Sequence, residues 1–154
     1  SIQYGMYYWD DNYPDSHVFA EGECLRKTFD PDFMLYHTMA VDEWGHMKGA
    51  DSAEYANAVA AVGHLIAARM PEWLEKGYQV VVTADHGMNN LGIHVGTEYA
   101  QREVALYIFS DKVENGRFEE NYISQLNVAP LVCKLMGVPA TEGMKQELEI
   151  VFSK

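Results

Sequence analysis

The chain has 154 residues, of which 48% are hydrophobic, which is enough for one globular domain with a buried core. Its formal net charge of −12 argues against binding to a nucleic-acid polymer, because such binding needs clustered Lys and Arg. The same charge slows the encounter with an anionic phosphate ester, unless bound cations reverse the sign of the charge at the site.

The first predicted element is a helix that begins at Pro14 and runs to about Thr28. Asp30 and Pro31 interrupt it, because the residue before a proline avoids the helical conformation. Residues 33–39 (FMLYHTM) then form a short apolar run, typical of a strand buried on both faces. This predicted strand leads directly into Asp42.

An Ala-rich segment from Ser52 to Met70 has apolar residues at helical spacing, and Pro71 marks its predicted end. Residues 79–83 (QVVVT) and 104–109 (VALYIF) are rich in β-branched or apolar side chains and predict two more buried strands. Residues 124–136 predict a last helix.

Predicted strands and helices alternate along the chain, which favours an α/β fold with parallel strand pairs. Ligand sites in such sheets gather outside the carboxyl ends of the strands. The sequence contains no internal repeat, low-complexity tract or second domain boundary. We therefore predict a single α/β domain with a partly parallel sheet flanked by helices.

Potential metal ligands gather in three short segments next to predicted strand ends. They are Asp42 and His46 in DEWGH, Asp85 and His86 in ADHGM, and His94 in GIHVGT. A mixed set of carboxylates and imidazoles suits Zn²⁺, which is our first choice, and is compatible with Mn²⁺ or Fe²⁺. All-oxygen sites would instead indicate Mg²⁺ or Ca²⁺.

Each segment alone is weak evidence, because an Asp-His pair or two such residues four apart occur by chance. The three segments together, on successive strand ends, favour a metal site over isolated structural residues. Gly45 and Gly87 lie beside the histidines and permit tight turns, so we expect the ligands to lie on loops. Asn89 and Asn90 are expected to shape the loop before His94.

The order and spacing of these motifs resemble one enzyme group. The D-x-x-G-H element, the S-x-x-Y helix start at Ser52 and the strand that ends in T-x-D-H-G resemble the nucleotide pyrophosphatase/phosphodiesterases. This group is the type I phosphodiesterase family of the alkaline phosphatase superfamily. The later run LNVAPLVCKLMGVP resembles a helix of the same superfamily, so the resemblance spans about residues 14–140.

The resemblance implies an alkaline-phosphatase-like fold, of which residues 1–154 form one partial, metal-binding domain. It implies two divalent metals, the first held by Asp42, His46 and His94 and the second partly by Asp85 and His86. In the family, the second metal also takes an Asp, and a Thr or Ser acts as the nucleophile. Both belong to a segment ahead of Ser1, and nothing in SIQYGMYYWDDN resembles it. We therefore expect an incomplete second site and no nucleophile in this chain.

The function that the resemblance implies is metal-dependent hydrolysis of phosphodiester or pyrophosphate bonds in nucleotides, with a small phosphate ester as the substrate of the intact protein. We expect little or no turnover from this chain alone. One alternative is a non-catalytic module for metal binding or assembly. Within the enzymes, a phosphosugar mutase-like activity or a phosphonate hydrolase remains open.

The remaining features bear on compartment and assembly. Cys24 and Cys133 are far apart in the sequence, so we interpret both as free thiols. No apolar run approaches the roughly 20 residues that span a bilayer, so we expect a soluble chain without membrane contact, and we leave its compartment open. An unpaired sheet edge invites self-association, so we also expect a homo-oligomer.

Overall fold

The structure is a computed structural model that describes residues 2–116, 122–144, 148 and 150–153. Its contacts group the chain into two compact units. Unit 1 comprises Ser1–Pro71 and Ala84–Val104, and unit 2 comprises Glu72–Thr83 and Ala105–Lys154. The structure mixes helices and strands, which confirms only that part of the fold prediction, and the prediction of one partial domain stays a prediction.

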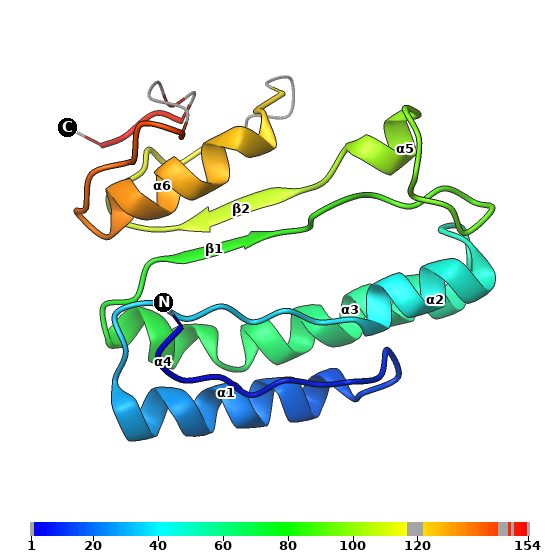
Figure 1. The fold of residues 1–154 in the computed structure, drawn as a ribbon, viewed down its shortest axis with the longest axis horizontal. Helices are drawn as coiled ribbons and strands as arrows, with labels where there is room; N and C mark the ends of the chain where they lie inside the picture. The colour runs from blue at the N-terminus through cyan, green and yellow to red at the C-terminus, as the bar shows by residue number, and fades with distance from the viewer. Residues whose placement is uncertain (1, 117–121, 145–147, 149, 154) are drawn as a thin grey trace. The chain divides into compact units, whose positions relative to one another are not determined.

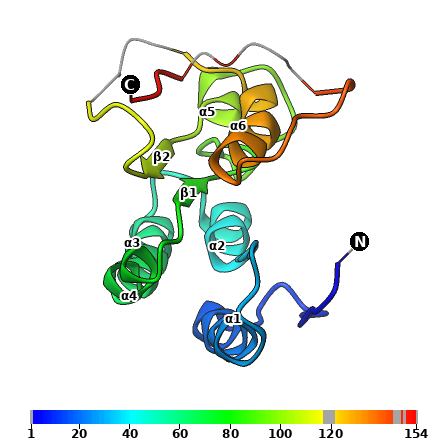
Figure 2. The same ribbon diagram turned by 90° about the vertical axis from the view of Figure 1, so that its left-hand side faces the viewer.

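Unit 1 is built mainly from the helices α1 (Asp15–Phe29), α2 (Ala40–Lys48) and α3 (Ala53–Ala67), whose axes run roughly alongside one another (Figure 1). Figure 2 shows the same helices nearly end-on, with α2 against α3. The helix α1 confirms the prediction from Pro14. It ends at Phe29, and the following residue, Asp30, adopts a left-handed conformation with φ of 44°.

The Ala-rich helix α3 begins where its sequence provides an N-cap. The Ser52 hydroxyl oxygen accepts a hydrogen bond from the Tyr55 amide at 3.1 Å. The helix ends at Ala67, before Pro71, so the prediction that this proline ends the helix was wrong. Pro71 instead lies in the first turn of α4 (Met70–Glu75), where its missing N–H leaves no helical hydrogen bond unmade.

The predicted strand at residues 33–39 is wrong. This segment has no assigned strand, and none of the described residues pairs with it as one. Its side chains nevertheless alternate, with Phe33 and Leu35 exposed while Tyr36 packs on α1. The Tyr36 ring lies 5.2 Å from the Phe19 ring, and its hydroxyl donates to Glu23 Oε1 at 3.0 Å. The apolar composition therefore reflects contact with a helix on one side only.

A buried carboxylate fixes the beginning of α2, which the sequence did not predict. Asp15, at the start of α1, is 8% exposed, and its Oδ1 accepts from the amides of Met39 and Ala40 at 3.1 and 3.4 Å. Negative charge at this end of a helix is favourable because the first N–H groups have no helical partner. Asp15 thus joins the starts of α1 and α2.

Unit 2 contains β1 (Val80–Thr83) and β2 (Leu106–Phe109), which confirm the two later strand predictions. The strands pair antiparallel, from Val80 opposite Phe109 to Thr83 opposite Leu106, and a parallel pair is not shown in the described residues. A parallel return needs a long crossover, usually a full helix. Between these strands the chain forms only a loop and the short helix α5 (Tyr99–Arg102).

The core of unit 2 lies between this strand pair and the helix α6 (Val128–Leu135), which the short 3₁₀ helix η1 (Gln125–Asn127) precedes. Leu131 and Leu135 of α6 are buried together with Ile150. Both helical segments fall inside the predicted helix at residues 124–136. None of the helices among the described residues is long and apolar enough to cross a membrane, and the prediction of self-association stays a prediction.

Two helix glycines of unit 1 give opposite expectations for stability. A Cβ added at Gly63 in α3 meets no atom within 4 Å, whereas one at Gly45 in α2 lies 2.7 Å from Met88 Cε and 3.2 Å from the Tyr55 ring. Gly63→Ala should therefore raise the free energy of unfolding by about 1 kcal/mol through helix propensity. Gly45→Ala should lower it, because overpacking costs about 1–3 kcal/mol. Urea unfolding of both variants measures this, and equal shifts would contradict the packing of α2 on Met88.

Candidate metal centre

The helix α2 carries two of the predicted ligands on one face. Asp42 and His46 are four residues apart, so their side chains lie one above the other. Asp42 Oδ2 and His46 Nε2 are 3.5 Å apart. The expectation that these ligands lie on a loop was wrong. Gly45, between them, makes no turn but lets the helix approach Met88 closely.

The third and fourth ligands follow β1. Asp85 Oδ1 accepts from the His86 amide at 3.1 Å, and His86 Nδ1 bonds the Gly87 carbonyl oxygen at 3.0 Å. Because a carbonyl oxygen only accepts, Nδ1 carries a proton, and Nε2 is the nitrogen left to coordinate an ion. His86 Nε2 lies 3.7 Å from Asp42 Oδ1 and 3.6 Å from Asp85 Oδ2.

The loop that ends at His94 is shaped by Asn89, as its sequence predicted. The Asn89 side-chain oxygen accepts from the amides of Leu91 and Ile93, both at 3.0 Å. Gly92 has φ of 73°, and a Cβ there would lie 2.7 Å from the His46 carbonyl oxygen. The loop therefore lies directly on α2, where His46 Nδ1 donates to the Gly92 carbonyl at 2.8 Å.

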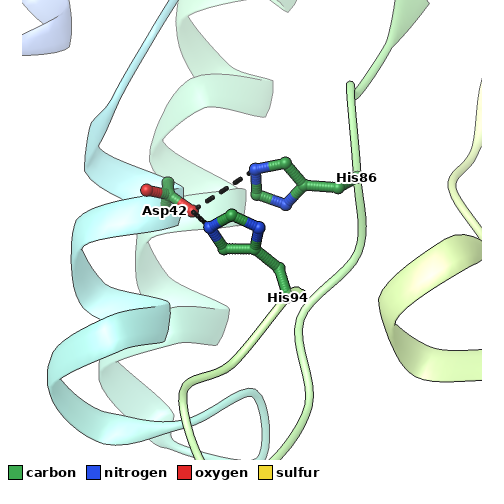
Figure 3. A group of neighbouring side chains, drawn as sticks. All are labelled: Asp42, His86 and His94. Carbon is green, nitrogen blue, oxygen red and sulfur yellow. Dashed lines mark ion pairs between the residues drawn. The ribbon is translucent and has the colours of Figure 1, made fainter. Parts of the chain in front are cut away.

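These elements bring a carboxylate and two imidazoles to one point (Figure 3). Asp42, His86 and His94 each offer one ligand atom, and these atoms all lie within 4.8 Å of one another. The rings of His86 and His94 stack with their centroids 3.7 Å apart, and His46 lies 5.0 Å from His94. All the residues concerned belong to unit 1.

The surroundings of one Asp42 oxygen show whether a cation would fit this cluster. Asp42 Oδ1 is buried and has no hydrogen-bond partner, and it faces His86 Nε2 at 3.7 Å and His94 Nε2 at 4.0 Å. These distances are too long for hydrogen bonds, since a side-chain contact of about 3.6 Å no longer counts as one. Two bonds of about 2 Å to one zinc ion leave their ligand atoms about 3–4 Å apart. The donor set and its spacing therefore fit a divalent cation.

Tyrosines beside the cluster stay protonated at neutral pH. Burial, and secondly the charge of Asp42, raise the pKa of Tyr55. Burial also raises the pKa of Tyr8, with further contributions from Asp11, Asp15 and Asp85. Tyr8 bonds His37 through its hydroxyl at 2.6 Å, which places both side chains near this acidic region. Neither phenol adds negative charge to the centre.

The structure brings the predicted ligands around a single carboxylate, with Asp42 near His46, His86 and His94, and Asp85 near His86. Their division between two metal ions stays a prediction. Sequence reasoning missed Gln101, a buried side chain of α5 that bonds the loop around His94. The sequence feature that could have revealed Gln101 is Glu98, three residues earlier, because the two residues form a capping box that marks a helix start.

Comparison with known proteins gives one family match. The family described as type I phosphodiesterase / nucleotide pyrophosphatase matches residues 9–131, which include all the candidate ligands. No solved structure matches the chain significantly.

The curated relatives include transferases from animals and fungi. The human GPI ethanolamine phosphate transferase 3, catalytic subunit, is 29% identical over 115 residues, which are 73% of this chain and 10% of that protein. The mouse counterpart is 29% identical over 145 residues, which are 89% of this chain and 13% of that protein. GPI ethanolamine phosphate transferase 2 of Debaryomyces hansenii is 25% identical over 121 residues, which are 70% of this chain and 14% of that protein. The chain thus spans only a small part of each relative.

The geometry predicts that the two carboxylates differ in importance. Asp42→Asn should weaken Zn²⁺ binding by more than about 100-fold, beyond the effect of losing an outer-shell partner, because its carboxylate faces three histidines. Asp85→Asn should weaken it less, since the Asp85 side chain is 72% exposed. Isothermal titration calorimetry measures both, with the exposed Asp32→Asn as control. Equal effects of the two substitutions would contradict the central place of Asp42.

Proposed function

The chain belongs to the type I phosphodiesterase / nucleotide pyrophosphatase family of the alkaline phosphatase superfamily, and on this premise we propose that it forms the metal-binding part of a phosphoester-transferring enzyme. The observation that carries the proposal is the buried Asp42 oxygen, which lacks a hydrogen-bond partner and faces imidazole nitrogens. A buried anionic oxygen without a partner is costly, and a bound cation removes that cost.

The proposed ligands are Asp42, His46, Asp85, His86 and His94. Divalent ions at these residues would polarise a phosphoryl oxygen and stabilise the leaving oxygen. Zinc is the first choice because the donors mix carboxylate with imidazole, and Mn²⁺ or Fe²⁺ remain compatible. The chain's own contribution is orientation, because the Gly92 and Gly87 carbonyls hold the Nδ1–H groups of His46 and His86 and leave both Nε2 lone pairs toward Asp42.

The proposal assigns no nucleophile to this chain. The family resemblance puts the attacking Thr or Ser and one further Asp ligand in a segment with no counterpart among residues 1–12. With zinc added, the 154-residue chain alone should therefore cleave a chromogenic phosphodiester far more slowly than an intact relative. Release of nitrophenolate measures this. A rate near that of the relative would contradict the absence of a nucleophile.

We favour phosphoesters that carry an ammonium group over nucleotides. The relatives above are named as ethanolamine phosphate transferases, and the net charge of −12 disfavours polyanions while attracting a cationic group. Transfer of ethanolamine phosphate to an acceptor alcohol is accordingly our first candidate. Hydrolysis of nucleotide diesters or pyrophosphates is the second candidate, and the family description favours it.

A pair of chromogenic substrates separates these candidates in the intact protein that carries this chain. The nitrophenyl ester of phosphoethanolamine should give a higher kcat/KM than the nitrophenyl ester of thymidine 5′-phosphate. Added salt should reduce the difference in kcat/KM between the two substrates, because it screens the electrostatic field of the chain's net negative charge. A nucleotide ester that reacts faster at every salt concentration would exclude the ethanolamine proposal and support the pyrophosphatase candidate. Failure of the chain to bind any divalent cation would instead favour an assembly module.

A further inference from the structure

Gln101 is a buried polar side chain whose hydrogen bonds go to the backbone around one candidate ligand. The residue is 5% exposed. Its Nε2 donates to the Ile93 carbonyl oxygen at 3.2 Å and makes a longer contact of 3.5 Å with that of Val95. Its Oε1 accepts from the Glu98 amide at 3.1 Å. The two carbonyl groups flank His94, so one side chain holds the backbone on both sides of that ligand.

The main chain of Gln101 reaches the other loop ligand. Its carbonyl oxygen accepts from the Gly87 amide at 2.9 Å, directly after His86. A Cβ added at Gly87 would overlap the Ala100 carbonyl oxygen, so only glycine permits this close approach to α5. Gln101 therefore bonds both segments that carry the stacked rings of His86 and His94.

Apolar burial does not hold the loop around His94 in place. Leu91 is 81% exposed, Ile93 42% and Val95 77%, so none of these side chains anchors it in a core. Local structure without such anchoring depends on its hydrogen bonds. The Gln101 amide is buried beneath the loop and supplies several of them.

We propose that Gln101 is a positioning residue that sets the place of the His94 imidazole relative to His86 and Asp42. The effect of Gln101 on metal affinity rests on the proposed function. The position of the His94 ring, by contrast, is a property of the chain without metal. Outer partners that orient metal ligands typically contribute about 10- to 100-fold in metal affinity. Loss of the Gln101 amide should act in that range while leaving the fold intact, because Ile93 and Val95 are exposed residues that water can reach.

The test compares Gln101→Met with Gln3→Met, an equivalent substitution at an exposed position. Methionine nearly matches glutamine in length but has no N–H donor. Titration of the 154-residue chain with Co²⁺, followed by visible absorption, should show affinity about 10- to 100-fold weaker and an altered ligand-field band for Gln101→Met only. Gln101→Asn, which keeps the amide but shortens its reach, should behave in the same direction. Co²⁺ affinity and absorption equal to the unsubstituted chain in both Gln101 variants would overturn the proposal.

Two further measurements separate positioning from a general loss of structure. Thermal unfolding of Gln101→Met should match that of Gln3→Met, and a much lower midpoint would overturn the proposal in favour of a structural role. In the metal-free chain labelled with ¹⁵N-histidine, the ring signals of His94 should shift in Gln101→Met and not in Gln3→Met. If the unsubstituted chain binds no Co²⁺, the proposed function fails. The His94 ring signals of Gln101→Met then test the positioning role by themselves, and signals equal to those of the unsubstituted chain overturn it.

Discussion

The Asp42 carboxylate is the constraint on which the rest of this centre depends. One of its oxygens is buried without a hydrogen-bond donor, and it faces imidazole nitrogens at distances too long for hydrogen bonds. Carbonyl groups accept hydrogen bonds from the Nδ1–H groups of His46 and His86, so each ring presents its Nε2 to Asp42. Acceptors that converge in this way repel one another unless a cation lies among them. The arrangement therefore suits a divalent cation, as proposed above.

Side chains that repel one another stay close together only if the segments that carry them are held in place. Here hydrogen bonds to the main chain hold those segments. Asn89 closes one loop through its side chain, and Gly92 lets that loop rest on α2. Gln101 then links the segments on both sides of the stacked rings. Because these bonds are made to the main chain, they fix ligand positions even where the loop side chains are exposed. Asp15 adds a similar bond at the start of α2, so the helix that carries Asp42 is fixed from a distant part of the sequence.

Much of this could be predicted from residue types and spacing, and the failures share a physical cause. The helices α1 and α3 follow from apolar periodicity with a proline start or a serine cap, and three motifs of matched spacing predicted the candidate ligands that the structure brings close together. Residues 33–39 have the composition of a buried strand, but a strand also needs a pairing partner, which composition does not reveal. The helix α2 is short and has glycine inside, so its propensity is weak and contact with α3 decides its form. The four residues of α5 are too few for any period, although the capping pair Glu98 and Gln101 marks them.

Ligand geometry and substrate choice depend on different parts of the molecule. Transfer to an alcohol and transfer to water both need the same stabilised phosphoryl group, so the proposed histidines and carboxylates would serve either reaction. What differs is the group at the far end of the ester and the acceptor that attacks it. On the proposed function, the net charge of −12 would act on those groups, and acidic side chains near Tyr8 add to it locally. A polyanionic nucleotide would meet repulsion, whereas an ammonium ester would meet attraction. The charge of the chain would thus separate substrates that its candidate metal ligands treat alike.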